Sequence, residues 1–561
     1  MNNLVVIAVL ILTGVTAQVQ STNTSRTKTG SITGIVVTEN GQPLSNVVIS
    51  IRAFGAPRSM QAVATDSDGK FEVNGLEPLT YQIAARHRLY SLRPREDGTP
   101  NNYHIGDSVR LVMEKGGVIT GVVTTRTGEP VVGVRVRVST IPNGETVKER
   151  STDDRGFYRI YGLPGGKYVV SAGGGGGMSF YPDPYDTDVT TYSPASTRDT
   201  AAEITVRAGE ETPNVDIRYR GEPGRTVSGT VSNPPVGQNG TTVTLISTSD
   251  GGTQFNAGSY PLDDGRGFMF FGVDDGDYTV IARTYQPNGE WSLSQPQRIN
   301  VKGSDVTGIE LALKPLASVS GQVVLEELKT KECGTKETPA LTEALVSAWH
   351  KQDEAAKALP NFVWGMGTPA SADAQGSFKL QNLAPGGYYF VTRFAAKSWY
   401  LQSITLVSST TKKAADATRV WTTIKGGDRI SGLKITLAEG AASLNGQLAL
   451  AEGEAVPEKL FVYLVPAEKE SGDEVLRFYA APVTPDGKVT LTNIAPGRYW
   501  LLSWTALEGG LTKLRLPDAT ETRAGLRREA EALKTEIELK PCQNLIDYPL
   551  TKKGVTTEGH P

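Results

Sequence analysis

The chain has 561 residues, of which 38% are hydrophobic and 21% charged, and its formal net charge is −3. At ~100–200 residues per domain, this length predicts about three to five folded units rather than a single core. The near balance of 57 basic and 60 acidic residues excludes a strongly basic surface, so we expect no nucleic acid partner and no attraction to an anionic membrane.

Residues 1–17 have the pattern of a secretory signal peptide. Leu4–Val15 is a short, mostly apolar segment, and Val15-Thr16-Ala17 supplies the small residues that a signal peptidase requires. An uncleaved anchor is the alternative, since the first three residues carry no Lys or Arg. No later segment is long and apolar enough for a transmembrane helix. We expect a secreted protein of the periplasm, the extracellular space or the cell surface.

Five copies of one pattern occupy most of the remaining chain, and each opens with an alternating strand around a glycine. Apolar residues on both sides of the glycine are spaced for one face of a half-buried strand. A glycine inside a strand lowers stability unless the backbone bulges or packs closely there, so we predict a backbone requirement. The five glycines are Gly34, Gly121, Gly229, Gly321 and Gly446.

An acidic turn lies in the middle of each copy, as in Asp66-Ser67-Asp68-Gly69 of the first. Asp can bond its own backbone two residues on and Gly accepts positive φ, which predicts a hairpin turn. Asp-x-Asp-Gly also begins a calcium loop, but the further oxygen ligands and the distal Glu are missing. We therefore expect no metal site and no cofactor.

A second turn precedes a tyrosine in each copy, as in Gly162-Leu163-Pro164-Gly165-Gly166-Lys167-Tyr168. This tyrosine can bury its ring and return its hydroxyl to nearby backbone, as in the tyrosine corner of immunoglobulin sandwiches. We predict a structural role for all five tyrosines, which are Tyr81, Tyr168, Tyr278, Tyr388 and Tyr499.

Each copy closes on another alternating strand, placed at 537–539 in the fifth. The fold class is therefore all-β, with five tandem seven-stranded immunoglobulin- or transthyretin-like sandwiches. Short connectors predict a semi-rigid extended array, on the order of 170 Å long at ~3.3 Å per strand residue. The expected modules are 28–114, 115–222, 223–316, 317–440 and 441–546, followed by a polar tail at 547–561.

One helix is expected, at 519–533. Its apolar residues gather on one side and mixed charges on the other, which predicts a packing helix inserted before the last strand. Docking of a partner is the alternative role.

The repeated pattern resembles the carboxypeptidase regulatory-like domain. The pattern is G-x-V…P-L-x-x-V-x-I…T-D-x-x-G-x-F…G-L-x-P-G-x-Y. It matches best in the first two modules, where its P-L-x-x-V-x-I part lies within 41–49 and 128–136. This resemblance covers nearly all of the chain after the signal and implies a transthyretin-like (prealbumin-like) sandwich. Related sandwiches are grouped as carbohydrate-binding-like, so it also implies sugar binding. The zinc carboxypeptidase catalytic domain that gives the family its name is absent, because no metal-binding His-x-x-Glu occurs.

Collagen-adhesin B-type repeats share these turns, but they need a Lys in the opening strand for an isopeptide bond. Ile32, Ile119 and Val227 stand near that region, so the crosslink is not expected.

No catalytic constellation is present in the sequence. The four histidines lack metal-ligand spacing, and no G-x-S-x-G elbow occurs. The glycine run 173–177 lacks the Lys-Ser/Thr of a phosphate-binding loop. We therefore expect that the protein is not an enzyme.

Candidate binding residues lie where the copies differ from one another. The loop 181–192 combines aromatic and acidic side chains, which could hold a sugar or calcium or could simply pin the loop. All seven tryptophans follow residue 290, and exposed Trp faces stack on sugar rings or anchor protein partners. The candidates are Tyr181, Asp183, Tyr185, Asp186 and Asp188 in the loop, and Phe362 and Trp364 in an insertion of the fourth module.

The leading functional hypothesis is a non-catalytic secreted or cell-surface scaffold of adhesin type, with a polysaccharide or an envelope protein as partner. The alternative is an accessory or regulatory subunit of a separate secreted hydrolase.

Cys333 and Cys542 are the only cysteines. In an oxidising compartment they either pair and join the fourth and fifth modules or remain separate thiols.

Overall fold

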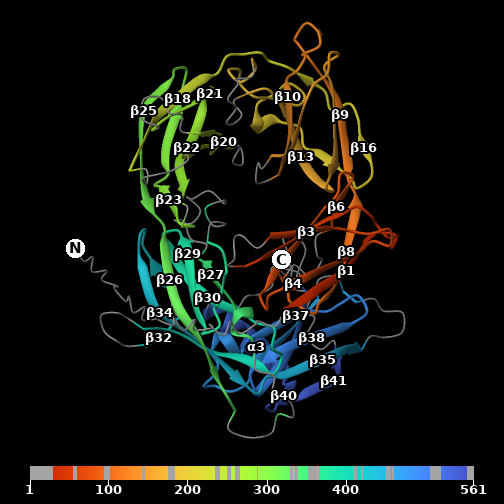
Figure 1. The fold of residues 1–561 in the computed structure, drawn as a ribbon, viewed down its shortest axis with the longest axis vertical. Helices are drawn as coiled ribbons and strands as arrows, with labels where there is room; N and C mark the ends of the chain where they lie inside the picture. Colours follow the sequence, from red (N-terminus) through yellow and green to blue (C-terminus); the bar gives the residue numbers. More distant parts are fainter. Residues whose placement is uncertain are drawn as a thin grey trace, which may run out of the picture.

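The computed structural model describes residues 29–54, 60–93, 102–141, 146–174, 184–233, 241–248, 254–258, 266–286, 288–328, 333, 339–351, 363, 367–407, 414–418, 421–449, 456–457, 460–505 and 520–551. The all-β class is confirmed, since successive β-sandwiches make up these residues (Figure 1). The predicted signal peptide lies outside them.

Module 1 shows the plan of each sandwich. Its strands are β1 (Gly30–Thr38), β2 (Val48–Ala53), β3 (Met60–Ala64), β4 (Lys70–Leu76), β5 (Tyr81–Arg86), β6 (Tyr90–Leu92), β7 (Asn102–Tyr103) and β8 (Ser108–Lys115). One sheet has the order β4-β1-β8-β6 and the other β3-β2-β5-β7. Alternate residues of each strand fill the core, among them Ile32, Ile49 and Val73.

Modules 2 and 3 vary this plan. Module 2 contains β9 (Gly117–Thr124), β10 (Arg135–Thr140), β11 (Thr146–Ser151), β12 (Phe157–Leu163), β13 (Gly166–Ala172), β14 (Thr191–Tyr192), β15 (Ile204–Val206), β16 (Glu211–Thr212) and β17 (Ile217–Arg218). Module 3 contains β18 (Arg225–Ser232), β19 (Thr242–Ser247), β20 (Gln254–Gly258), β21 (Gly267–Val273), β22 (Gly276–Tyr285), β23 (Trp291–Ser294), β24 (Gln297–Val301) and β25 (Val306–Pro315). In module 3, β23 pairs with both β22 and β25 and so joins its two sheets.

Modules 4 and 5 complete the series. Module 4 contains β26 (Ala317–Glu326), β27 (Leu345–His350), β28 (Ala370–Ser371), β29 (Ser377–Leu383), β30 (Gly386–Arg393), β31 (Trp399–Val407), β32 (Ala414–Asp416), β33 (Thr422–Ile424) and β34 (Arg429–Glu439). Module 5 contains β35 (Ala442–Ala449), β36 (Leu460–Pro466), β37 (Tyr479–Pro482), β38 (Lys488–Ile494), β39 (Gly497–Thr505), helix α3 (Thr520–Leu533), β40 (Glu536–Leu539) and β41 (Asn544–Thr551). Within the described residues module 5 has the expected seven strands, and the other modules carry one or two more.

The glycine of each opening strand allows close packing against the closing strand. Gly321 in β26 lies beside β34, which runs parallel to it. A Cβ on Gly321 would clash with the carbonyl oxygen of Leu433 and would approach the ring of Phe378 to 2.7 Å. Gly34 makes the equivalent contact with Val109 of β8. The predicted backbone requirement is confirmed: in these two modules the parallel strand and an aromatic ring occupy the space of the missing side chain.

The five repeat tyrosines play the predicted structural role. Each is buried, with at most 5% of its surface exposed, and each hydroxyl donates a hydrogen bond to the carbonyl oxygen four residues earlier. The acceptors are Glu77, Pro164, Asp274, Ala384 and Ala495, at 2.6–2.9 Å. Burial is the main cause that raises the pKa of four of these phenols, those of Tyr81 (to about 12), Tyr168, Tyr388 and Tyr499.

Module 5 ends later than the sequence indicated. The expected closing strand at 537–539 is β40, which pairs with β39 in the second sheet. The parallel partner of the opening strand β35 is β41, so the predicted polar tail at 547–561 is wrong for its first five residues. Leu550 is buried and Tyr548 packs against the core of the module, and this burial stabilises the strand.

Helix α3 packs on module 5, as predicted. Leu526 and Ala530 are buried against Phe461, Tyr463 and Leu502 of the second sheet. Arg527 lies over the ring of Trp500, with its guanidinium carbon 5.5 Å from the ring centroid. The helix therefore covers an apolar sheet face.

Modules 4 and 5 have an asparagine at a turn position where the earlier modules have glycine, and its side chain forms hydrogen bonds to the preceding module. Asn382 and Asn493 adopt positive φ (63° and 56°), as do Gly75 and Gly162 at the same place in modules 1 and 2. The Oδ1 atom of Asn382 accepts a hydrogen bond from the backbone N–H of Trp291 in module 3 at 2.8 Å, and its amide donates to Gly289 at 3.1 Å.

A disulfide adds a covalent tie between modules 4 and 5. Cys333 and Cys542 are 209 residues apart in sequence, and their Cα atoms lie 5.5 Å apart. This is an ordinary Cα separation for a disulfide.

The expectation of an extended array is wrong, because the modules bend into a closed circuit. In Figure 1 module 1 (red) reaches modules 4 and 5 (green-blue and blue). The hydroxyl of Thr80 in module 1 donates to the carbonyl oxygen of Glu343 in module 4 at 3.1 Å, and the hydroxyl of Ser371 donates to that of Phe54 at 3.3 Å. Successive angles between neighbouring modules bring module 1 back to module 4 (Figure 1), and the ties between modules 3 and 4 and between modules 4 and 5 fix two of these junctions.

Among the described residues, no helix combines the length and the apolar character needed to cross a membrane.

Candidate functional site

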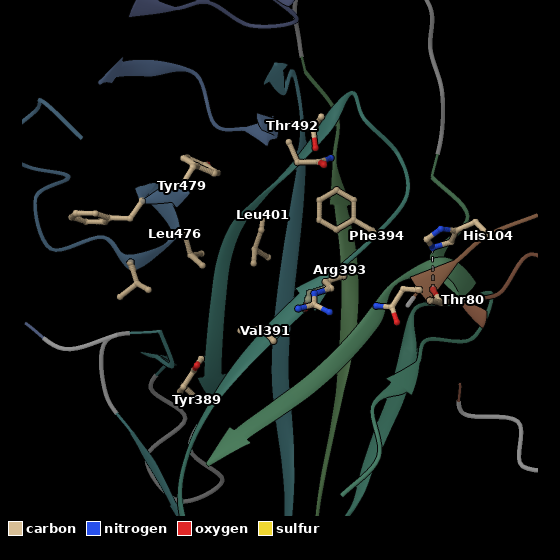
Figure 2. A pocket seen from close by; sticks show the side chains of 15 residues that line it. Thr80, His104, Tyr389, Val391, Arg393, Phe394, Leu401, Leu476, Tyr479 and Thr492 are labelled. Atoms are coloured by element: carbon tan, nitrogen blue, oxygen red, sulfur yellow. Dashed lines mark hydrogen bonds between the residues drawn. The ribbon is translucent and has the colours of Figure 1, made fainter. Parts of the chain in front are cut away.

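A cavity of about 570 Å³ lies where modules 1, 4 and 5 meet (Figure 2). Closure of the circuit creates it, because no single module supplies all of its walls. Module 1 contributes Thr80, Asn102 and His104; module 4 contributes Tyr389, Val391, Thr392, Arg393, Phe394 and Leu401; and module 5 contributes Val475, Leu476, Phe478, Tyr479, Thr492 and Asn493.

Strand β30 provides the floor of this cavity. Tyr389, Val391 and Arg393 alternate along the strand and therefore share one face of the sheet β28-β27-β30-β33. At ~3.3 Å per residue, the Cα atoms of Tyr389 and Arg393 lie about 13 Å apart. Strand β27 runs beside them, with Trp349 opposite Tyr389 and Leu345 opposite Arg393.

Arg393 is the only Lys or Arg among the lining residues, and none of them is Asp or Glu. Its side chain keeps access to solvent. Burial by the surrounding protein lowers the pKa of its guanidinium. Arg393 therefore supplies a positive charge that the cavity wall does not neutralise.

His104 faces the cavity from module 1. Its Nε2 atom lies 3.2 Å from the hydroxyl of Thr80, which itself donates to Glu343 of module 4. The hydroxyl has one proton, so the imidazole donates from Nε2 in this arrangement. Burial lowers the pKa of His104, and the nearby carboxylate of Asp107 opposes that shift.

Module 5 closes the cavity with a network of buried phenols. The hydroxyl of Tyr479 accepts a hydrogen bond from the backbone N–H of Ala495 at 2.8 Å. Arg477 donates to the hydroxyl of Tyr499 at 3.2 Å. Burial is the main cause that raises the pKa of Tyr479. These groups are engaged with one another and form a fixed wall.

Three aromatic rings form a ridge at the Tyr389 end of the sheet face. Trp349 stacks on Tyr389 with ring centroids 6.3 Å apart and planes 25° apart. Trp421 meets Tyr389 edge-on, with centroids 5.0 Å apart. Trp349 is 46% exposed. We call Trp349, Tyr389 and Trp421 the aromatic ridge; Tyr389 links it to the cavity.

The described part of the candidate loop in module 2 uses its polar groups within the module. The hydroxyl of Tyr185 donates to the carbonyl oxygen of Val132 at 2.9 Å, and Asp188 accepts from the hydroxyl of Tyr219 at 2.9 Å. Asp186 lies 3.9 Å from the guanidinium of Arg135. These contacts give Tyr185, Asp186 and Asp188 a role in pinning the loop.

Four other candidates, Tyr181, Asp183, Phe362 and Trp364, lie outside the described residues.

In the acidic turns, the aspartate carboxylate accepts hydrogen bonds from backbone N–H groups of the same turn. Oδ1 of Asp66 accepts from the N–H groups of Asp68 and Lys70, and Asp373 does the same in module 4. In module 5 the hydroxyl of Thr484 takes this place, at 3.0 Å from the N–H of Lys488. Among the described residues, no group of three or more His, Cys, Asp or Glu could hold a metal ion.

Sequence reasoning missed Arg393, His104 and the aromatic ridge. One signal was available: Tyr389 follows a repeat tyrosine and must point away from the core, where an aromatic side chain calls for an explanation. The partners of Arg393 could not be inferred, because His104 lies 289 residues earlier and reaches the cavity only through closure of the circuit.

Comparison with known families supports the resemblance in module 1. The model of the carboxypeptidase regulatory-like domain matches residues 31–102. A search of the curated proteins finds no match to the chain.

Solved structures similar to the chain include a bacterial pilin and part of a collagen-binding protein. A minor pilin of Streptococcus agalactiae matches with 13% identity and a TM-score of 0.21, over 34% of this chain and 96% of the pilin. Two B repeat units of the collagen-binding protein of Staphylococcus aureus match with 12% identity and a TM-score of 0.13, over 73% of this chain and all of that one. At such low values these similarities identify no ligand or activity of this chain.

Proposed function

We propose that the protein is a non-catalytic extracytoplasmic scaffold of adhesin type, and that it binds carbohydrate on the aromatic ridge of module 4. The observation that carries this proposal is the exposed face of Trp349, which is held by stacking on Tyr389. Aromatic faces pack well against the C–H faces of sugars, and rings fixed by neighbours lose little entropy when they bind.

The ridge suits an extended polysaccharide. It lies on the outer face of a regular sheet, with Trp349 on β27, Tyr389 on β30 and Trp421 just before β33. Rings on neighbouring strands offer successive stacking surfaces. The paired strands fix the spacing of Trp349 and Tyr389, which favours a repeating ligand.

A rigid arrangement of modules supports the scaffold role. The asparagine contacts, the disulfide and the hydrogen bonds between modules 1 and 4 hold the ridge in a defined orientation. A disulfide also fits an oxidising compartment, which agrees with the signal peptide expected from the sequence.

The test is affinity electrophoresis of the purified chain in gels that contain soluble polysaccharides, followed by a glycan array. We expect retention by at least one polysaccharide, and at least tenfold weaker binding, about 1.4 kcal/mol, for Trp349→Ala. Phe157→Ala in module 2 is the matched control, because Phe157 is also exposed (38%) but belongs to no ridge.

Two results would contradict the proposal. The first is absence of retention by every polysaccharide tested. The second is equal binding by the wild type and the folded Trp349→Ala variant. Co-purification with a secreted hydrolase, in the absence of any glycan binding, would favour the accessory-subunit alternative.

A further inference from the structure

The cavity between modules 1, 4 and 5 has the composition of a small-molecule site. Such sites have apolar walls and a few polar groups that orient the ligand. Val391, Leu401, Leu476 and Phe478 supply apolar surface from two modules. The volume of about 570 Å³ is in the range typical of ligand pockets.

The charge of the lining residues favours an anionic ligand in this cavity. Arg393 reaches it with a guanidinium, and no Asp or Glu lies among the lining residues. A guanidinium and a carboxylate match in a planar pair of hydrogen bonds, which strengthens in a partly water-excluded site. One guanidinium suits a monoanion better than a phosphate dianion, because no second lysine or arginine lies in the lining.

Two further polar groups line the cavity from module 1. They are Asn102 and His104, and a bound oxygen atom can accept a hydrogen bond from the side-chain amide of Asn102. Thr392 faces the core of module 4, on the side of β30 opposite Val391 and Arg393, so its hydroxyl contributes nothing to the site.

We propose that this cavity binds a small organic carboxylate with an apolar or aromatic body, with its carboxylate paired to Arg393 and its body against Val391, Leu401, Leu476 and Phe478. This site shares Tyr389 with the aromatic ridge but does not depend on sugar binding there. Because the walls come from three modules, the bound ligand also stabilises the closed circuit: it binds the closed form and not an open one.

The probe is 4-phenylbutyrate, and its uncharged amide, 4-phenylbutyramide, is the matched ligand control. Binding to the full-length purified protein is measured by isothermal titration calorimetry at pH 7.5. We expect saturable binding of the acid and at least tenfold weaker binding of the amide, since the amide keeps the body and loses the charge.

Variants test the assigned contact. Arg393→Gln should weaken binding of the acid at least tenfold and should leave binding of the amide unchanged. Arg298→Gln is the matched control, because Arg298 is exposed on β24 of module 3 and does not line the cavity. Leu476→Trp, which fills the cavity without touching the charge, should weaken both ligands. Circular dichroism checks that each variant is folded.

The inference is overturned if the acid does not bind at millimolar concentration, if the acid and the amide bind equally, or if folded Arg393→Gln binds the acid like the wild type. Trp349→Ala should bind 4-phenylbutyrate normally. Failure of the sugar proposal and failure of this one are therefore distinguishable.

Discussion

Asn493 donates its side-chain amide to the carbonyl oxygen of Trp399 at 2.7 Å, across the junction between modules 5 and 4. The same amide donates to Ala396 at 2.8 Å. Asn493 occupies a position where modules 1 to 3 have glycine, and its φ of 56° is one that asparagine tolerates better than most residues. Asn493 therefore both shapes a turn of module 5 and holds module 5 against module 4.

Replacement of Asn493 should weaken the junction in two separable steps. Asn493→Gly keeps the positive φ and loses both hydrogen bonds, at about 1 kcal/mol each. Asn493→Ala also strains the backbone, for roughly 1–2 kcal/mol more. Urea denaturation followed by Trp fluorescence measures both losses. Asn233→Gly is the control, since Asn233 has a similar φ of 57° and an exposed side chain; an equal loss there would contradict the role of Asn493 at the junction.

Removal of the disulfide should destabilise modules 4 and 5 together. The Cys333→Ser/Cys542→Ser variant loses a constraint on a segment of 209 residues, and a typical disulfide contributes about 2–4 kcal/mol. Calorimetry should show a lower melting temperature for the variant, and dithiothreitol should lower that of the wild type alone. If the reductant leaves the melting temperature of the wild type unchanged, the Cys333–Cys542 disulfide does not stabilise the protein.

Loss of a repeat tyrosine hydroxyl should cost one buried hydrogen bond. Tyr388→Phe keeps the ring in the core and removes the bond to Ala384, so we expect a loss of about 1 kcal/mol in the free energy of unfolding. Tyr161→Phe is the control, because Tyr161 is 36% exposed. Equal stabilities of Tyr388→Phe and the wild type in urea would show that the corner bond is not needed.

Acidification should weaken the contact of module 1 with module 4. Because burial lowers the pKa of His104 below its ordinary 6.5, the folded state binds fewer protons there than the unfolded state. The free energy of unfolding then falls as the pH drops below about 6.5. Thermal melts at pH 7.5 and 5.0 should show a smaller drop for His104→Asn than for the wild type. An unchanged pH dependence in that variant would refute the assignment.

Sequence reasoning predicted the features that depend on neighbours in the chain. The tyrosine corner joins residues four positions apart, and the acidic turns join residues two to four apart, so each leaves a local signature. Strand β41 was missed because Pro549 and the positive φ of Asp547 interrupt the alternation that marks a strand. Its place is set instead by parallel pairing with β35, about a hundred residues earlier.

The closed circuit and its cavity could not be predicted, because they depend on the angles at four junctions. Thr80 and Glu343 are 263 residues apart, and small changes in each angle would separate them. The tryptophan distribution did point to modules 4 and 5. Which tryptophan is exposed depends on strand register, which places Trp349 beside Tyr389 on the outer face.

Closure of the five modules is the central claim, and small-angle X-ray scattering of the full-length protein tests it most directly. The account predicts a compact distance distribution, with a maximum dimension far below the value on the order of 170 Å for an end-to-end array of sandwiches. The Thr80→Val/Ser371→Ala variant, which lacks two of the closing hydrogen bonds, should shift the distribution toward longer distances. An extended distribution for the wild type, near that end-to-end length, would contradict the closed circuit and the cavity that depends on it.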